Sequence, residues 1–388
     1  MKNKLIISTL LSTLVLSSCS RGSSADEQPT SAVTPHTPPI SYDYQFSRED
    51  ISTVDLEEGK LLIDQFYWLD NRMKSSSSFS REKYQEKMHF GKSIEDITAQ
   101  SIGYYLKNET IKAQVKKDID HYFEDLELIA NANQEANKGI AGWIGYEEER
   151  RYVNSYGEET GQVLQKALMG LTLLDRINNH HLSDEVLNNV KLQKDNSDLV
   201  LVPGKKYTEL EHHWDMAFAY LGKENSVFKP LFIANYLEKE TKDMPFLKGI
   251  DERVYKAYFL GRKAIAEKNY TEMNQQAAII KKELNTLFAA RAIYYLKKAI
   301  PDLKEDPRNA FHGLSEAYGF IYALNATLKN DNTPYLNHSE IQQLLSDLRG
   351  TDGFWEIDRL AADSKTKGSL LYTAQTIATA YGFNLNEI

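Results

Sequence analysis

The sequence predicts an all-α protein, a duplicated helical bundle that follows a flexible N-terminal tether. Three observations support this fold class. Apolar residues beyond the tether recur at spacings of three and four, long strand-like stretches are hard to find, and two segments one hundred residues apart repeat one pattern. With 388 residues, 41% of them hydrophobic, the chain can bury a substantial core in one large domain or two fused halves.

The first element is a lipoprotein signal peptide over residues 1–18. Lys2 and Lys4 precede the apolar run Leu5–Leu16, which is too short to span a bilayer as a helix. The following Leu16-Ser17-Ser18-Cys19 has the pattern of a lipobox. The alternative is a signal-anchor helix that stays in the membrane. We favour lipidation, because small residues precede the cysteine as a lipoprotein signal peptidase requires. Acyl chains contribute roughly 0.8 kcal/mol per buried methylene and would anchor the chain without a transmembrane helix.

Lipidated Cys19 is the expected start of the mature protein. We expect it to anchor the chain to the outer membrane, facing either the periplasm or the cell surface. Residues 19–42 are rich in Ser, Thr and Pro and lack an apolar period, so they predict a disordered tether. Residues 43–388 would form the all-helical domain, whose two bundle halves divide near 225–250.

Helical spacing begins after the tether. A helix is expected around 61–69, and the serines at 75–78 that follow it predict an exposed loop. The stretch 163–177 has the clearest helical period of apolar side chains. Its apolar residues are Val163, Leu164, Ala167, Leu168, Leu171, Leu174 and Ile177.

The C-terminal half shows the same period over 274–300, and Pro301 is expected to end that helix. Ser339 is expected to act as the N-cap of a short helix that begins at Glu340. Proline-containing loops separate the helical stretches. These loops lie at Pro203-Gly204, Pro230, Pro245, Pro307 and Pro334.

Charge and cysteine content limit the classes of function. The 46 Lys and Arg residues against 55 Asp and Glu give a net charge of −9, which argues against general nucleic-acid binding. An acidic surface suits cationic ligands such as metal ions, although it serves solubility in most proteins. Because the single cysteine is assigned to lipidation, a metal site must use His, Asp, Glu or Tyr.

The repeated pattern lies in 212–221 and 312–321. His212 corresponds to His312, and an aromatic, small, aromatic, aliphatic run recurs at the end of both segments. A duplicated bundle would produce this correspondence. Small residues at 219 and 319 would let two helices approach closely while the flanking aromatics fill the core, but this packing does not explain the histidines.

Each repeated segment contains one pair of potential metal ligands. His212 and Asp215 are three residues apart, and His312 and Glu316 are four apart, so each pair would share a helix face. Two such pairs meeting across a pseudo-twofold axis would offer four ligands to zinc, iron or manganese. The alternative is that both histidines pack in the core and donate a ring N–H to the nearby carboxylate.

Other motifs carry less chemistry. His180-His181 lies at an expected helix end, where a cation favours the helix dipole, so we interpret it as capping. The sequence contains no HExxH helix, GxSxG elbow, Walker loop or GxGxxG fingerprint. Common hydrolase and nucleotide chemistry is therefore not expected.

Several ordered motifs resemble the DUF4856 family of bacterial lipoproteins, chiefly from Bacteroidetes, over most of the chain after the tether. These motifs are Tyr152-Val153-Asn154 to Gly157-Glu158, Gln162 to Gly170, Tyr207 to Asp215 with Ala217 to Tyr220, Gly261 to Ile265, and His312 to Glu316.

In that family Glu usually stands where this chain has Met216, giving His-x-x-Glu from His213. The segment looks like the GxHxxE motif of imelysin-like proteins, and Met216 breaks that motif here. The resemblance implies a duplicated, imelysin-like helical fold in a cell-envelope protein associated with iron acquisition. Carried over residue by residue, it selects His212, His213, Asp215, His312 and Glu316 as metal or ligand residues, with Glu209 and Glu211 as outer candidates.

The sequence and the resemblance together predict a non-enzymatic lipoprotein that binds a divalent metal, iron or zinc, or haem, and assists its uptake at the cell envelope. One alternative is a non-catalytic accessory protein of an outer-membrane transporter, whose histidines are structural. The other is a peptidase-like metal-dependent hydrolase, which would need a water-activating acid near the metal.

Overall fold

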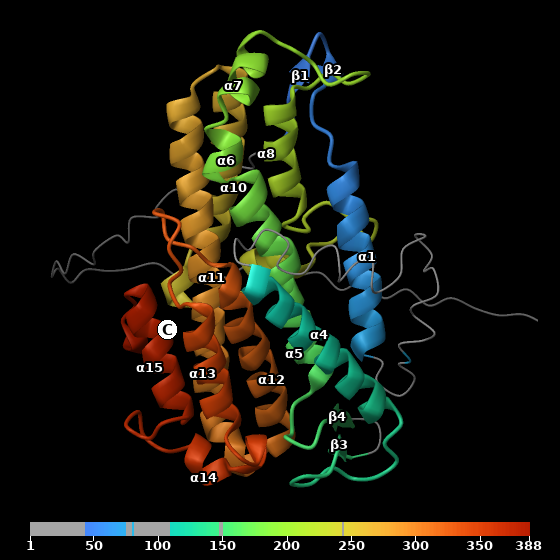
Figure 1. The fold of residues 1–388 in the computed structure, drawn as a ribbon, viewed down its shortest axis with the longest axis vertical. Helices are drawn as coiled ribbons and strands as arrows, with labels where there is room; N and C mark the ends of the chain where they lie inside the picture. Colours follow the sequence, from blue (N-terminus) through green and yellow to red (C-terminus); the bar gives the residue numbers. More distant parts are fainter. Residues whose placement is uncertain (1–42, 75–79, 81–108, 147–149, 243) are drawn as a thin grey trace, which may run out of the picture. The chain divides into compact units, whose positions relative to one another are not determined.

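The computed structural model describes residues 43–74, 80, 109–146, 150–242 and 244–388 (Figure 1). The chain divides into two compact units, Met1–Ser41 and Tyr42–Ile388, and every described residue lies in the second. The predicted signal peptide, Cys19, the tether and the loop at 75–78 lie outside the described residues. The division near 225–250 stays a prediction.

Helices dominate the described residues, which confirms the all-α prediction. The longer α-helices are α1 (Glu57–Lys74), α4 (Glu109–Ala130), α5 (Thr160–Leu168), α7 (Val190–Ser197), α8 (Glu209–Ala219), α10 (Ile250–Ala266), α11 (Tyr270–Glu305), α12 (Pro307–Ala323), α13 (His338–Arg349) and α15 (Leu370–Tyr381). Single-turn α-helices are α6 (Asp184–Leu187), α9 (Phe232–Asn235) and α14 (Ile357–Leu360). Within the described ranges, every helix is too short or too polar to cross a lipid bilayer.

Other regular structure is short. The strands β1 (Ser47–Arg48) and β2 (Ile51–Ser52) pair antiparallel, as do β3 (Gly142–Ile144) and β4 (Arg151–Val153). The 3₁₀ turns are η6 (Pro245–Leu247), η7 (Leu324–Ala326), η8 (Gly353–Trp355) and η9 (Leu385–Glu387). Three segments are π-helical: η3 (Met169–Leu174), η4 (Ile177–His181) and η5 (Tyr236–Glu240). Because π-helix is rare and frequent at functional sites, these three segments direct attention to their surroundings.

The long helix α11 organises the packing. It contacts α10, α12 and α15, while α5 packs on the other side of α12 (Figure 1). Its buried residues, such as Ile280 and Leu284, recur at helical spacing, as the sequence predicted. The expected end at Pro301 is wrong, because α11 continues to Glu305. A proline in the last turn removes one backbone hydrogen bond, and fully buried Leu303 holds the turn that follows.

The predicted N-cap of α13 is also wrong, by two residues. Asn337 rather than Ser339 caps this helix, and its side chain accepts from the Glu340 backbone N–H at 3.0 Å. The Glu340 carboxylate accepts in turn from the Asn337 N–H at 2.7 Å. This reciprocal capping box satisfies two backbone donors, which Ser339, the second residue of the helix, cannot do.

The two repeated segments lie in α8 and α12, and each brings a small residue against another helix. A Cβ atom added at Gly319 of α12 would lie 2.5 Å from the Val163 carbonyl oxygen of α5. A Cβ added at Gly59 of α1 would lie 2.3 Å from the Ala219 Cβ of α8. Close helix approach at positions 219 and 319 is therefore present, whereas the duplication itself stays a prediction.

Candidate functional site

Helix α8 begins with a capping box that sets the direction of its side chains. The Thr208 hydroxyl accepts from the Glu211 N–H at 3.4 Å, and the Glu211 carboxylate accepts from the Thr208 N–H at 2.8 Å. Glu211 and Asp215 are one turn apart and share a face. His213 lies between them in sequence and therefore projects from the opposite face of α8. The helix thus takes part in two different clusters.

The first cluster is a buried ion network around Arg262 of α10. Its guanidinium donates to Asp215 Oδ1 at 2.9 Å and to Glu211 Oε1 at 3.0 Å, and all three side chains are at most 1% exposed. Tyr44 donates to Asp215 at 2.7 Å and Arg48 to Glu211 at 3.1 Å. Burial raises the pKa of Asp215 to about 6, although Arg262 opposes that rise. This network holds α8, α10 and the N-terminal segment together and commits Asp215 to Arg262.

His212 lies apart from this network. Its ring stacks on Tyr207, with ring centroids 4.7 Å apart and an interplanar angle of 10°. Its Nδ1 is buried and has no hydrogen-bond partner among the described residues, and burial lowers its pKa. The predicted pair of His212 and Asp215 is therefore not formed, because the carboxylate turns to Arg262 and the imidazole to Tyr207.

The second cluster, which we call the histidine trio, consists of His180, His181 and His213. The π-helical segment η4 supplies the first two, and α8, which packs against η4, supplies the third. Each of the three offers one ring nitrogen, and these nitrogens lie within 4.8 Å of one another. Among the described residues, this is the one group of three or more His, Cys, Asp or Glu side chains arranged so.

The imidazoles of the trio are in the form that can offer nitrogen lone pairs to a metal. Burial lowers the pKa of each histidine, and the neighbouring imidazoles lower the pKa of His181 and His213 further. The pKa of His213 falls to about 4. Arg176 also lowers the pKa of His180 and His181 through its positive charge. All three imidazoles are therefore neutral at pH 7, which is the form that binds a metal.

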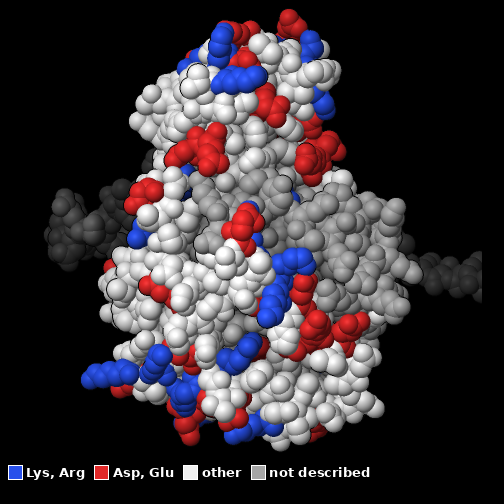
Figure 2. Space-filling model, viewed as in Figure 1, with Lys and Arg blue, Asp and Glu red and all other residues white. Residues whose placement is uncertain are grey.

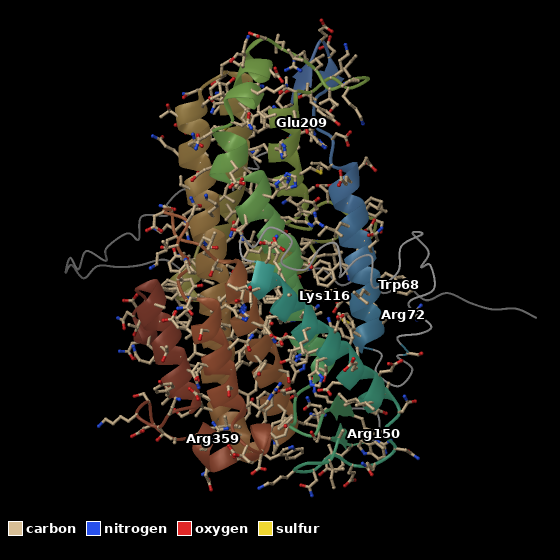
Figure 3. The ribbon with its side chains drawn as sticks, viewed as in Figure 1. Trp68, Arg72, Lys116, Arg150, Glu209 and Arg359 are labelled. Carbon is tan, nitrogen blue, oxygen red and sulfur yellow. The ribbon has the colours of Figure 1, made fainter. Side chains whose placement is uncertain are left out.

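The geometry of the trio fits one metal ion. His181 Nδ1 and His213 Nδ1 are 3.0 Å apart, and two nitrogens of a tetrahedral zinc site are about 3.3 Å apart at normal bond lengths. Glu209, labelled on the first turn of α8 in Figure 3, places a carboxylate oxygen 4.0 Å from His213 Nε2. Neutral imidazoles suit zinc, copper, nickel and ferrous iron.

His312 and Glu316 belong to a different place, a cavity of about 830 Å³ that they line together with Lys166. Lys166 Nζ and Glu316 Oε1 form an ion pair at 2.9 Å, and both side chains are largely buried. His312 Nδ1 lies 2.7 Å from Glu159 and 2.8 Å from Arg151. The predicted pair of His312 and Glu316 is 3.9 Å apart, but each member has a closer partner.

The five predicted ligand residues therefore do not form one set. His213 lies in the trio, Asp215 in the ion network, His212 against Tyr207, and His312 and Glu316 at the cavity. Their roles as ligands stay a prediction. Sequence reasoning missed His180 and His181 as ligand candidates, although a double histidine at a helix end was the signal that could have found them. Met216 is buried in the core.

Comparison with protein families gives a match that is independent of this geometry. The family described as "Domain of unknown function (DUF4856)" matches residues 41–384. The chain belongs to the DUF4856 family. No curated protein and no solved structure matches it. In this DUF4856 protein the imelysin-like fold accordingly stays a prediction, and the sites described above rest on their own geometry.

Proposed function

We propose that this DUF4856 protein is a non-enzymatic, lipid-anchored protein of the outer membrane that binds a divalent transition metal, zinc or iron, and takes part in its uptake. The observation that carries the proposal is the histidine trio. Three neutral imidazoles converge within 4.8 Å, a donor set that suits such an ion. Haem binding, a transporter partner and a peptidase-like activity stay predictions from the sequence.

The placement of the trio supports metal binding over simple packing. His181 is buried, whereas His180 and His213 are half-buried, so an ion could reach the trio from the solvent past either of these two rings. The competing arrangement is a direct hydrogen bond between the two Nδ1 atoms, with one ring as donor and the other as acceptor. A metal bound to both Nδ1 atoms would replace that hydrogen bond, and the ring that carried its proton on Nδ1 would carry it on Nε2 instead, so binding at pH 7 needs no net release of protons.

Metal titration of the full chain in detergent, followed by calorimetry, tests the proposal. We expect stoichiometric binding of Zn²⁺ or Fe²⁺ that is lost in His213→Ala and in His181→Ala. The double variant His212→Ala/His312→Ala is the matched control and should keep the site, because neither residue belongs to the trio. Unchanged binding in His213→Ala would overturn the assignment, and loss confined to the double variant would move the site to the residues first predicted.

The anchor is tested separately. The proposed attachment through Cys19 predicts that the wild type incorporates radiolabelled palmitate and that Cys19→Ser does not, because the thiol that carries an acyl-bearing group would be missing. A wild type that stays in the membrane fraction without label would contradict lipidation and favour a signal-anchor helix. Neither outcome depends on metal binding, so the two parts of the proposal can fail independently.

A further inference from the structure

The cavity that His312 and Glu316 line has more basic than acidic side chains. Its walls come from α1, α5, α9, α11, α12, the π-helical segments η3 and η5, and the loop 229–231. It contains six Lys or Arg side chains and three Asp or Glu side chains, an excess of cations in a chain whose net charge is −9. The cations are Lys74, Lys166, Lys229, Lys239, Arg291 and Lys298. By contrast, acidic and basic groups are interspersed over the described face that Figure 2 shows.

Three of these cations already have acidic partners. Lys74 pairs with Asp70 at 2.9 Å, and Lys166 pairs with Glu316 at 2.9 Å. Arg291 is 3.8 Å from the Glu240 carboxylate, and it donates to the Glu240 carbonyl at 2.8 Å. The three acids of the cavity are thus neutralised by their neighbours. An anion entering the cavity would therefore meet little uncompensated negative charge.

The other three cations are exposed lysines at the edge of the cavity. Lys229, Lys239 and Lys298 have no ion pair with any described residue. The ammonium of Lys229 lies 5.4 Å from the centre of the Tyr67 ring, and that of Lys298 lies 5.8 Å from the centre of the Tyr294 ring. A cleft edged with charge of one sign attracts ligands of the opposite sign.

Arg291 provides a buried donor. Only 2% of its side chain is exposed, and it contacts the faces of Tyr236, Tyr294 and Tyr295 at 4.4–5.0 Å. Its Nε is buried without a hydrogen-bond partner among the described residues. Leaving such a donor unpaired is costly, so the site is more stable when an acceptor reaches it. Of the tyrosines that line the cavity, Tyr67 and Tyr294 are half-buried and offer part of a flat apolar ring to a ligand.

We propose that this cavity binds a small organic anion that carries several carboxylate groups on a ring. The excess lysines would attract it, Arg291 would offer a buried donor to one carboxylate, and the tyrosines would contact its ring. The volume of about 830 Å³ falls in the range of small-molecule sites. The histidine trio is not needed for this binding, so the inference stands independently of the proposed metal site.

Calorimetry at low ionic strength with benzene-1,3,5-tricarboxylate as the probe tests the inference on the full chain in detergent. We expect saturable binding at one site, and no saturable binding of the neutral benzene-1,3,5-tricarboxamide. The triple variant Lys229→Gln/Lys239→Gln/Lys298→Gln should weaken binding at least about tenfold, because it removes the unpaired positive charge. These lysines are exposed, so the variant is expected to fold.

A second triple variant, Lys191→Gln/Lys194→Gln/Lys263→Gln, is the matched control. It removes the same charge from exposed lysines that do not line the cavity, and it should bind the tricarboxylate as the wild type does. Equal weakening in both triple variants would show general charge attraction and overturn the site. Equal binding of the tricarboxylate and the tricarboxamide, or no binding of either, would also overturn it.

Discussion

The two repeated segments, in α8 and α12, each set an acidic side chain against a buried cation from a neighbouring helix, yet their surroundings differ. Asp215 and Arg262 are both fully buried at 2.9 Å. Glu316 and Lys166 also lie at 2.9 Å, but they line a cavity of about 830 Å³. Residues 44–53 cover the first pair through Tyr44, Arg48 and Thr53. The two acids do not correspond in the repeated pattern, in which Asp215 aligns with Ser315 and Glu316 with Met216. The comparison teaches that similar helix segments can each hold a buried ion pair, whereas the covering segments decide whether a ligand can reach it.

The largest expected effect comes from removing the cation of the enclosed pair. Arg262→Met leaves Asp215 and Glu211 buried without their main partner, and we expect it to lower the free energy of unfolding by about 3–5 kcal/mol. The equivalent change at the cavity, Lys166→Met, should cost about 1–2 kcal/mol, because water in the cavity can solvate Glu316. Urea unfolding followed by circular dichroism measures both. Equal losses would contradict the distinction between an enclosed and an accessible pair.

A smaller effect is expected from adding a side chain at the point where α12 lies close to α5. Gly319→Ala places a methyl group 2.5 Å from the Val163 carbonyl oxygen, and we expect it to cost about 1–3 kcal/mol of stability through overpacking. Gly313 is the matched control on the same helix, because a Cβ atom there meets nothing within 4 Å.

Gly313→Ala should be neutral, or should stabilise α12 by up to about 1 kcal/mol through helix propensity. Thermal unfolding of the two variants gives the comparison. Similar melting temperatures for Gly319→Ala and Gly313→Ala would show that α5 and α12 can separate to admit a side chain.

The smallest effect is a pH dependence of stability on the trio side of α8. The pKa of His213 is about 4 in the folded state, below the ordinary value of 6.5. The unfolded chain therefore binds more protons between these values, and the free energy of unfolding should fall as pH drops from about 6.5 to about 4. His180, His181, His212 and Glu209 face this ring, and the charges of His180 and His212 contribute to the lowering of its pKa.

His213→Gln should flatten that slope, so that the variant loses about 1–2 kcal/mol less than the wild type between pH 7 and pH 4.5. Asp215, whose pKa is raised to about 6, acts in the opposite direction in both proteins and cancels in the comparison. Urea unfolding at the two pH values provides the measurement, with the exposed His121→Gln as control. Identical slopes for wild type and His213→Gln would show that this ring does not titrate as the fold requires.

The helical fold could be predicted because its signal is local. The apolar residues spaced over 163–177 are all buried, and helix α1 includes the expected stretch 61–69. The π-helical turns were not predicted, since a wider turn keeps nearly the same apolar spacing and depends on the neighbouring helices. The continuation of α11 past Pro301 depends on the burial of Leu303, which lies beyond the proline.

The sites were harder to predict because their partners are distant in sequence. His213 meets His181 across 32 residues, and Lys166 meets Glu316 from another helix altogether. The i, i+3 and i, i+4 rule places two side chains on one face of a helix, but it does not say which neighbour they bind. Asp215 lies on the same helix as His212, as predicted, but it pairs with Arg262 instead. A buried carboxylate is stabilised more by a cation than by a neutral imidazole.

The helix that runs from Thr160 to His181 changes its winding along its length. It is α-helical to Leu168, π-helical over Met169–Leu174, and π-helical again from Ile177. A π turn closes one residue later than an α turn, so each wide turn shifts the angular phase of everything after it. If Met169–Leu174 wound as an α-helix with the same number of residues, both imidazoles would rotate around the helix axis, away from His213. Whether His180 and His181 face His213 of α8 thus depends on the number of residues per turn in their helix, as well as on the identity of the three residues.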